Sequence, residues 1–535
     1  MAKVFSKYGF GYFIKEYHLT AYVPAHSAAK DTLSDPLTVR FRKILEELGP
    51  TYIKLGQMLS LHPDIIPPEF CKEFEKLQDN VFPIEFEKIK DVLEKEYGKP
   101  LGEVFKDFPS TPLASASLAQ VYKVFLGNKE AIVKVRKPGV EEIVRADLDL
   151  LDFLVKHLEK HVKELQAYNL SGLLEEFKAY ILNELDFTNE NINIEILRKN
   201  FLHDNSVHIP LVYQKYCTDK VLVIEYINGT KLSDIKRFKD LGMETPKIAR
   251  TLTECILKQI FIDGVFHADP HPGNIFILAG GKISLVDFGV LGRIDDDIRF
   301  SFAHFFIAAA TKDAELLMKV LQNTGAMGYA DESLVKRSFQ LLLDKYFGMT
   351  LEEFNMNDFL NDFNRIVYLN KIRVLPNNFL LFKTLGILES EAKMLDPTLN
   401  LMLEIKRMAE RVVEDEYSIA RIARKIGAFS ADVLYLLQNF PRDLISIIDE
   451  IKNGRLVIGF EHRNLEGLIG MLDKASNRLS FSMLVAAIII GSALLVHTSG
   501  ASFLGSHHQL GIAGFVVAGA LGLWLVGSIM RSGKL

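Results

Sequence analysis

The sequence predicts an α+β protein with two lobes around a cleft, an N-terminal helical extension and a C-terminal transmembrane helical hairpin. Three observations predict this class. Strand-like segments are short and fall in two parts of the chain, while most of the rest alternates apolar and polar residues at helical spacing. A run of acidic, amide and histidine residues lies beside the second group of strands, and two long uncharged apolar segments end the sequence.

Composition sets the outer limits. The chain has 535 residues, is 48% hydrophobic and carries a formal net charge of -5. It is long enough for two or three domains, and its near-neutral balance gives no reason to expect nucleic acid as a partner. The three cysteines, Cys71, Cys217 and Cys255, form no short motif, which favours a reducing compartment over disulfides or a zinc site.

The elements follow in order along the chain. Helical periodicity interrupted by prolines comes first, followed by two strands, VYKVFL and EAIVKV, joined by a glycine turn. A helical insertion and the buried strand VLVIEY come next, and the short strands NIFIL and KISLVDF then form a hairpin in a helical lobe. The predicted divisions are an N-terminal helical extension over 1–110, a first lobe over 111–230, a second lobe over 231–400, a helical region over 401–478 and a hairpin over 479–535.

The segment HADPHPGNIFILAGGKISLVDFG carries the chemistry. It places His267, Asp269, Asn274 and Asp287 in an H-x-D-x4-N-x12-D-F-G pattern. One carboxylate must orient an attacking hydroxyl or accept its proton, and an amide with a second carboxylate must hold Mg²⁺ on phosphate oxygens. We expect Asp269 to do the first and Asn274 and Asp287 the second, because the spacing matches the protein-kinase signature.

A kinase site also needs a lysine on a strand, a glutamate to hold it and a hinge for adenine. In AIVKV, Lys134 shares a strand face with Ile132 and is the expected phosphate-binding residue. Glu184, in NELDFTNEN, is the expected partner of Lys134. The hinge is expected in VIEYINGT, with the backbone of Glu225 and Ile227 meeting the nucleotide.

Alanines occupy the place of a glycine-rich nucleotide loop. The stretch PLASASLAQVYKV precedes the first strand, and alanine restricts backbone angles that glycine allows. We expect a stiff loop that limits phosphoryl transfer. Its expected nucleotide-binding residues are Leu113, Ala114, Ser115, Ala116, Ser117, Leu118, Ala119, Gln120 and Val121.

The sequence also departs from ordinary protein kinases. Two residues after Asp269, where serine/threonine kinases usually carry a lysine, stands His271. There is no Ala-Pro-Glu motif after Asp287, and the chain runs directly into the apolar stretch IRFSFAHFFIAAA. These departures predict a kinase fold with a protected, non-standard substrate site.

The last part of the chain predicts a membrane anchor. Residues 479–498 and 510–530 are free of Asp, Glu, Lys and Arg, and basic residues flank the pair on both outer sides. Small residues at Gly514, Ala518 and Gly522 lie on one helical face and would let a partner helix approach closely. The alternative is a buried apolar hairpin of a soluble domain.

Together these motifs resemble the UbiB/AarF-type atypical kinase family, which is linked to coenzyme Q biosynthesis. The resemblance rests on the alanine-rich loop, HADPHPGN with DFG, a K-x-G-Q motif at Lys54, Gly56 and Gln57, and an E-x-D motif at Glu184 and Asp186. It runs strongly from about residue 20 to 300 and in general plan to the C-terminus.

The resemblance implies more than the residues alone. The unit holding K-x-G-Q would fold over the cleft as a regulatory element, and Asp186 would help hold it there. The resemblance also implies ATP and Mg²⁺ as cofactors, an ATPase or small-molecule kinase activity that supports isoprenoid quinone synthesis, and a location at the inner (cytoplasmic) membrane with the kinase-like part in the cytoplasm. The implied partners are the lipid bilayer, quinone precursors and quinone-biosynthesis enzymes. The oligomeric state stays open, a homodimer included.

Two other functions remain open from the residues. A small-molecule phosphotransferase of the aminoglycoside or choline kinase type also uses an H-x-D-x4-N loop without a long activation segment. A nucleotide-binding scaffold without turnover could recruit biosynthetic enzymes, although the intact Lys134, Asp269, Asn274 and Asp287 count against a dead site.

Overall fold

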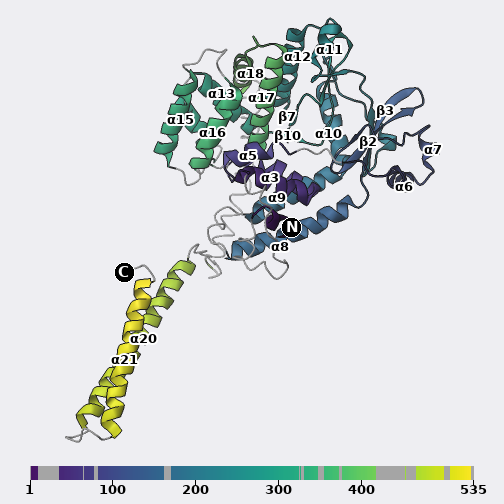
Figure 1. Ribbon diagram of the computed structural model, residues 1–535. Helices are drawn as coiled ribbons and strands as arrows, with labels where there is room; N and C mark the ends of the chain where they lie inside the picture. Colours follow the sequence, from purple (N-terminus) through teal and green to yellow (C-terminus); the bar gives the residue numbers. More distant parts are fainter. Residues whose placement is uncertain are drawn as a thin grey trace. The chain divides into compact units, whose positions relative to one another are not determined.

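The protein is described by a computed structural model with two compact units, Met1–Ile426 and Gly427–Leu535 (Figure 1). The structure describes residues 2–9, 35–63, 65–77, 82–161, 170–311, 313–323, 326, 331–347, 355–370, 372, 376–416, 418, 452, 465–498 and 506–531. The first unit combines small sheets with many helices and the second is a pair of helices, so the predicted α+β class is confirmed.

A four-stranded antiparallel sheet in the order β1-β2-β3-β5 forms the first lobe. Its strands are β1 (Ala114–Ser115), β2 (Ala119–Leu126), β3 (Lys129–Arg136) and β5 (Val221–Glu225). Ala131, Val133 and Val135 are fully buried on one face, where they pack with residues of α6 (Phe86–Tyr97) and α7 (Leu101–Val104). Lys134 therefore points to the other face, as the alternation in AIVKV predicts.

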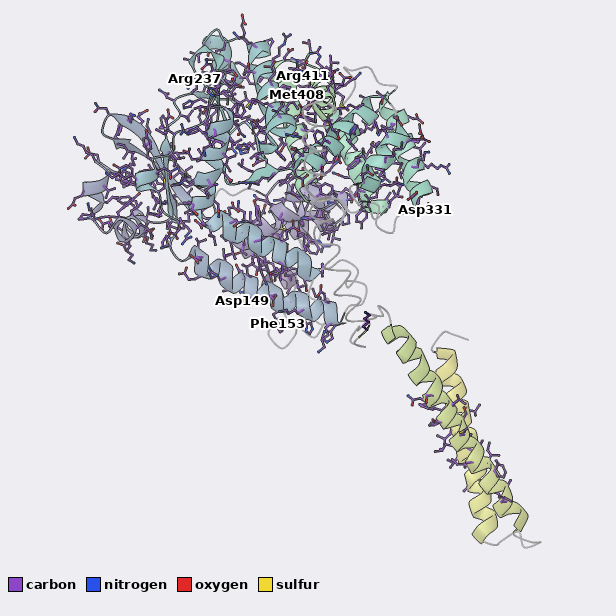
Figure 2. The ribbon with its side chains drawn as sticks, turned by 180° about the vertical axis from the view of Figure 1, so that it is seen from behind. Asp149, Phe153, Arg237, Asp331, Met408 and Arg411 are labelled. Atoms are coloured by element: carbon purple, nitrogen blue, oxygen red, sulfur yellow. The ribbon has the colours of Figure 1, made fainter. Side chains whose placement is uncertain are left out.

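Three described α-helices lie between β3 and β5 in the sequence. They are α8 (Val140–His161), α9 (Leu170–Leu185) and α10 (Phe187–Asn200). α8 packs on α9 through buried residues such as Val144 and Phe177, and Asp149 and Phe153 project from its outer side (Figure 2). The Asp186 side chain accepts a hydrogen bond from Thr188 N, which ends α9 and starts α10 in a new direction.

The described N-terminal helices contact α8, α9 and the second lobe. They are α1 (Ala2–Lys7), α3 (Leu37–Leu48), α4 (Pro50–Leu59) and α5 (Pro68–Phe74). α4 contacts both α8 and α9, and α5 contacts α16 of the second lobe. α6 and α7 instead cover the back of the sheet, so the predicted extension over 1–110 is divided between two places in the fold.

The second lobe contains two further small sheets. One has the order β4-β9-β8-β6, and in the other β7 pairs with β10. Their strands are β4 (Val207–His208), β6 (Thr230–Lys231), β7 (Val265–His267), β8 (Ile275–Ile277), β9 (Ile283–Leu285) and β10 (Leu291–Arg293). β8 and β9 form the predicted hairpin, with the short 3-10 turn Ala279–Gly281 between them.

Helices make up the rest of the second lobe. They are α11 (Ile235–Asp240), α12 (Thr245–Lys258), α13 (Asp296–Thr311), α14 (Ala314–Asn323), α15 (Glu332–Phe347), α16 (Met356–Leu369), α17 (Pro376–Leu395) and α18 (Leu401–Glu416). A π-helical turn, Gln259–Asp263, extends α12, and the 3-10 turn Gln214–Tyr216 precedes β5. The apolar stretch after Asp287 is α13, whose Phe302 and Phe305 rings lie 5.3 and 5.6 Å from Phe382 of α17.

In the described part of the second unit, the long helices are α20 (Leu465–Thr498) and α21 (Ser506–Arg531). The helices pack closely where a Cβ added to Gly514 would collide with Ser492, and the neighbouring Ala518 is buried. Gly522 has open space instead. Within the described residues, no helix combines the length and the apolar character needed to cross a membrane. The hairpin is therefore helical as predicted, but its transmembrane assignment is not supported by the described residues.

Candidate active site

Lys134 is the centre of the site. Its Nζ lies 2.7 Å from Glu190 Oε2 and 3.7 Å from Asp287 Oδ1. Burial acts to lower the pKa of Lys134, but the two carboxylates outweigh it and raise that pKa, so the lysine is charged. The same lysine holds the pKa of Asp287 below its usual range. Lys134 is thus a protonated lysine held between the carboxylates of Glu190 and Asp287, and it can bind phosphate oxygens.

The glutamate that holds Lys134 is Glu190, which corrects the expectation of Glu184. Glu190 lies in the first turn of α10, on the face buried with Phe187 and Ile194. Its Oε1 also accepts a hydrogen bond from Phe288 N at 3.3 Å, so Glu190 joins the strand lysine to the D-F-G segment. A charged residue on an otherwise apolar helical face is the signal that could have identified it.

Glu184 has a different partner. It lies at the end of α9 and forms an ion pair with Lys54 Nζ of α4. The carboxylate of Asp186 accepts from both Thr188 N and Thr188 Oγ1, so it caps α10 instead of holding the N-terminal extension. The E-x-D segment therefore connects the extension, through Glu184, to the helix that carries Glu190.

The other K-x-G-Q positions fix α4 against its neighbours. A Cβ on Gly56 would collide with Leu45 and Leu77, so only glycine permits this close packing. The Gln57 amide donates a hydrogen bond to Leu77 O at 3.0 Å. Lys54 thus joins the extension to α9, whereas Gly56 and Gln57 make contacts within the extension. The regulatory role of the three residues stays a prediction.

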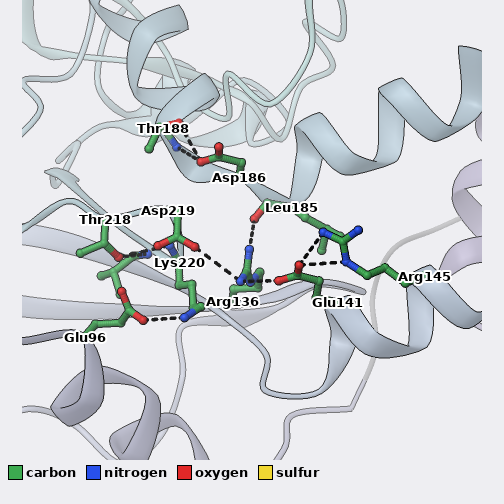
Figure 3. Close-up of polar contacts among 11 residues, drawn as sticks. Glu96, Arg136, Glu141, Arg145, Leu185, Asp186, Thr188, Thr218, Asp219 and Lys220 are labelled. Carbon is green, nitrogen blue, oxygen red and sulfur yellow. Dashed lines mark hydrogen bonds and ion pairs between the residues drawn. The ribbon is translucent and has the colours of Figure 1, made fainter.

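Arg136 organises the E-x-D turn from below (Figure 3). Its buried guanidinium donates to Leu185 O at 2.7 Å and to Glu141 Oε2 at 2.9 Å, and lies 3.6 Å from Asp219 Oδ2. Asp219 O in turn accepts from Phe187 N. Because Arg136 is on the same strand as Lys134, it ties the register of β3 to the position of Glu184 and α10. The sequence analysis did not identify this residue.

His267 shapes the loop that carries Asp269. Its Nδ1 accepts from Asp269 N at 3.2 Å and its Nε2 lies 3.1 Å from Val286 O, so the ring is neutral with the proton on Nε2. Burial lowers the pKa of His267, which agrees with a neutral ring. His267 therefore joins the loop of Asp269 to the strand end before Asp287 through hydrogen bonds.

Asn274 and Asp287 lie at the open end of the β8–β9 hairpin. Val286 N donates to Asn274 O at 2.9 Å, which places Asp287 beside Asn274 in the backbone. Asp287 has a φ of 62°, an uncommon angle for a residue with a side chain, and its side chain is 57% exposed. The described residues contain no cluster of three or more His, Cys, Asp or Glu side chains able to hold a metal. An amide and one carboxylate nevertheless fit Mg²⁺, which keeps waters and phosphate oxygens among its ligands.

The alanine-rich loop is a tight hairpin. Leu113 N donates to Val121 O at 2.7 Å, and Ala116 N donates to Ala119 O at 2.9 Å. All residues from 113 to 121 have negative φ, because the described non-glycine residues with positive φ are Asp107 and Asp287. This backbone does not require glycine, which explains why alanine is accepted.

Tertiary contacts hold the tip of the loop. Lys137 Nζ donates to Ala116 O at 2.7 Å, and burial lowers the pKa of this lysine. The Leu118 side chain is buried among residues of α4, α8 and α9. Gln120 turns to the back of the sheet, where it accepts from Ile84 N and donates to Tyr122 Oη. These contacts hold the loop tip in position; the stiffness of the loop and its effect on phosphoryl transfer stay predictions.

The expected hinge lies at the end of β5. The Glu225 carboxylate is 3.0 Å from His208 Nε2 and accepts from Leu211 N at 3.1 Å. Tyr226 N donates to Glu130 O, and the Ile227 side chain is buried. These contacts fix the strand end; the nucleotide contacts of Glu225 and Ile227 stay a prediction.

Three family models and a curated relative match most of this chain. Residues 76–321 match the family described as the ABC1 atypical kinase-like domain, 339–400 the UbiB helical domain and 463–531 the ABC1/UbiB kinase-like C-terminal domain. The chain is 30% identical over 465 residues to a probable protein kinase UbiB of Shewanella baltica, with 86% of this chain and 84% of that protein covered. The chain belongs to the ABC1/UbiB family of atypical kinase-like proteins.

Other family relatives cover similar lengths. An uncharacterized protein from the hydrogenase 1 5′ region of Clostridium pasteurianum is 30% identical over 541 residues, covering 100% of this chain and 98% of that protein. A solved structure, the complex of Rv3197 with erythromycin from Mycobacterium tuberculosis, is 23% identical and covers 69% of this chain and 94% of its own. Its TM-score of 0.45 is too low to carry an argument.

Proposed function

We propose that this ABC1/UbiB family member binds Mg-ATP and acts as an atypical kinase or ATPase. The observation that carries the proposal is the ion pair of Lys134 and Glu190 with Asp287 beside it. A charged lysine held by a helix glutamate, next to a D-F-G aspartate, is the arrangement that kinases use on nucleotide phosphates. Family membership favours this function over a phosphotransferase of the aminoglycoside or choline kinase type.

The roles of the residues follow from their positions. Lys134 would bind phosphate oxygens, and Asn274 and Asp287 would hold Mg²⁺. When bound, Mg²⁺ would neutralise charge on those oxygens. Asp269, whose side chain is 44% exposed, can accept a hydrogen bond from an attacking hydroxyl or water and orient it. Glu190 keeps Lys134 in place, and His267 holds the loop of Asp269 by hydrogen bonds to both sides.

Two matched variants test this function. Mg-ATP should raise the melting temperature of the full chain, and Asp287→Asn should abolish that rise because it removes the metal carboxylate. Asp269→Asn should keep the rise and lose ATP turnover. Asp297→Asn, an exposed carboxylate at the start of α13, is the charge-matched control and should behave as wild type. An undiminished rise in Asp287→Asn would contradict the metal assignment, and retained turnover in Asp269→Asn would remove that residue from the chemistry.

We also propose that the C-terminal unit associates with membrane lipid at the inner membrane. The hairpin leaves many apolar side chains exposed, and large exposed apolar surfaces mark interaction sites. They are Leu479, Met483, Leu484, Ile489, Ile490, Leu494, Ile512, Phe515, Val516, Val517, Leu523 and Trp524. The full chain should float with vesicles of phosphatidylethanolamine and phosphatidylglycerol, and replacing Leu523 and Trp524 together by Gln should weaken flotation. Equal flotation of both proteins would contradict a lipid-facing hairpin.

The pathway is proposed from the family resemblance. We propose that the activity supports isoprenoid quinone synthesis, with quinone precursors or quinone-biosynthesis enzymes as partners. Deleting the gene and profiling membrane lipids tests this role. A fall in quinone would support it, whereas normal quinone levels would defeat the pathway and leave the enzymology to the variants above.

A further inference from the structure

Lys383 of α17 lies at the expected catalytic aspartate. Its Nζ is 3.4 Å from Asp269 Oδ1, and the two side chains are 35% and 44% exposed. The next residue, Thr384, is fully buried, and its hydroxyl lies 2.8 Å from Leu380 O of its own helix and 3.2 Å from Ala268 O. Since Ala268 directly precedes Asp269, α17 is in direct contact with the catalytic loop. The fold, and not a chance side-chain rotamer, brings Lys383 to this position.

The packing of α17 keeps Lys383 there. Phe382, on the other side of Lys383 from Thr384, lies 5.3 Å from the ring of Phe302 and 5.0 Å from that of Phe363. Such aromatic pairs each contribute about 0.5–1.5 kcal/mol beyond their buried area. α17 also packs against α12 and β10 in the centre of the lobe (Figure 1). Buried neighbours on both sides of Lys383 therefore fix its backbone.

The catalytic loop itself lacks a cation at the usual place. His271 stands two residues after Asp269, and its Nδ1 accepts from Gly273 N at 3.0 Å, which turns the ring back onto its own loop. A positive charge beside Asp269 comes instead from Lys383, on a different element.

The charge of Lys383 also acts on a carboxyl group of the N-terminal extension. The protein around Glu75, just after α5, raises the pKa of that carboxyl although its side chain reaches solvent, and the charge of Lys383 opposes the rise. Lys383 thus lies within electrostatic reach of a carboxylate from the extension and beside one from the catalytic loop. A cation beside the Asp269 carboxylate, still 35% exposed, can turn to an anionic ligand.

We propose that Lys383 is a second phosphate-binding cation of this site, in addition to Lys134, and contacts the terminal phosphate of a bound nucleoside triphosphate. This inference rests on the proposed function. In the step it serves, an oxygen of the acceptor hydroxyl or water forms a bond to the terminal phosphorus. The bond from that phosphorus to the bridging oxygen breaks, and its electron pair leaves with the nucleoside diphosphate. The acceptor proton passes to Asp269, and Lys383 keeps its own proton and stabilises the negative charge of the transferring group.

The test compares ATP and ADP binding to the full chain with Mg²⁺, by equilibrium titration, in Lys383→Met, Lys383→Gln and Lys383→Arg. We expect ATP affinity to fall about tenfold in the Met and Gln variants, because one charge-assisted bond is lost, while ADP affinity stays unchanged. Lys383→Arg should restore most of the ATP affinity. Lys406→Met, an exposed lysine on α18, is the control and should match wild type.

The possible outcomes distinguish a failure of this inference from a failure of the proposed kinase or ATPase function. Equal losses of ATP and ADP affinity would assign Lys383 a structural role, and unchanged affinities would remove it from the site; either result overturns the inference alone. Faster ATP turnover in the Met or Gln variant would make the Lys383–Asp269 pair an inhibitory contact and would also overturn it. Wild-type protein that binds neither nucleotide would overturn the proposed function together with the inference. Should Lys383→Met fail to fold, the Gln and Arg variants give the same comparison.

Discussion

Substituting Leu118 by alanine would release the tip of the nucleotide loop. Leu118 is 5% exposed and packs in a cluster with Met58 of α4, Val144 of α8 and Phe177 of α9. The loop is otherwise held by its polar anchors and by its own backbone hydrogen bonds. Leu118→Ala therefore removes the hydrophobic anchor and leaves the polar anchors in place.

The magnitude follows from burial. The substitution removes three carbon atoms from a buried site, which costs about 2.4 kcal/mol at about 0.8 kcal/mol per group. Helices from three segments surround the site and limit its collapse, so a cavity term raises the expected loss to about 3–4 kcal/mol. Ordering even one freed loop residue costs about 1–2 kcal/mol, so nucleotide affinity should also fall about tenfold.

Urea unfolding followed by circular dichroism measures the first effect, and titration with a fluorescent ATP analogue the second. Tryptophan fluorescence does not serve, because the single tryptophan, Trp524, lies in the C-terminal hairpin. Leu118→Met should cost under about 1.5 kcal/mol, and Leu202→Ala, at a 65% exposed site, under about 0.5 kcal/mol. A loss below about 1 kcal/mol in Leu118→Ala, with unchanged nucleotide affinity, would refute the anchoring of the loop.

Three further predictions follow from the contacts of the site. Glu190→Gln should cost about 1.5–3 kcal/mol and weaken nucleotide binding, because it removes the charged hydrogen-bond partner of Lys134. Glu184→Gln should keep nucleotide affinity, and equal losses in titration would contradict the assignment of Glu190. The free energy of unfolding should fall as pH drops below about 6.5, because the unfolded state protonates His267 while burial keeps the native ring neutral. Urea titrations at several pH values measure this dependence. A His267→Asn protein whose free energy of unfolding changes with pH as steeply as that of the wild type would rule this out. Arg136→Gln should cost about 1.5–3 kcal/mol and speed amide exchange at the E-x-D turn; unchanged exchange would show that Arg136 does not position it.

The lysine and the catalytic loop could be placed from sequence because short-range rules determine them. Alternation along a strand with one fully buried face determines where Lys134 points. A hairpin with strong turn residues brings Asn274 and Asp287 together regardless of the rest of the fold. Each of these depends on neighbours within one or two elements.

Glu190 and Lys383 escaped prediction for different physical reasons. Asp186 breaks the helix between Glu184 and Glu190, so helical spacing cannot be carried from one carboxylate to the other. Lys383 reaches Asp269 from a distant part of the chain, and nothing in its local pattern distinguishes it from a solvated helical lysine. Contacts of this kind depend on how helices pack, which the periodicity of one segment does not contain.

The contact between Thr384 and Ala268 affects where the C-terminal boundary of the catalytic unit lies in this protein. The kinase-like match ends at residue 321, yet the loop of Asp269 contacts α17, which lies beyond that residue. A protein shortened to the matched residues would keep Lys134 and Glu190. It would lose the Thr384 hydroxyl beside the Ala268 carbonyl and the Lys383 ammonium group beside Asp269. The smallest piece able to reproduce this site must therefore extend through α17, so a conventional kinase boundary is the wrong place to cut this family member.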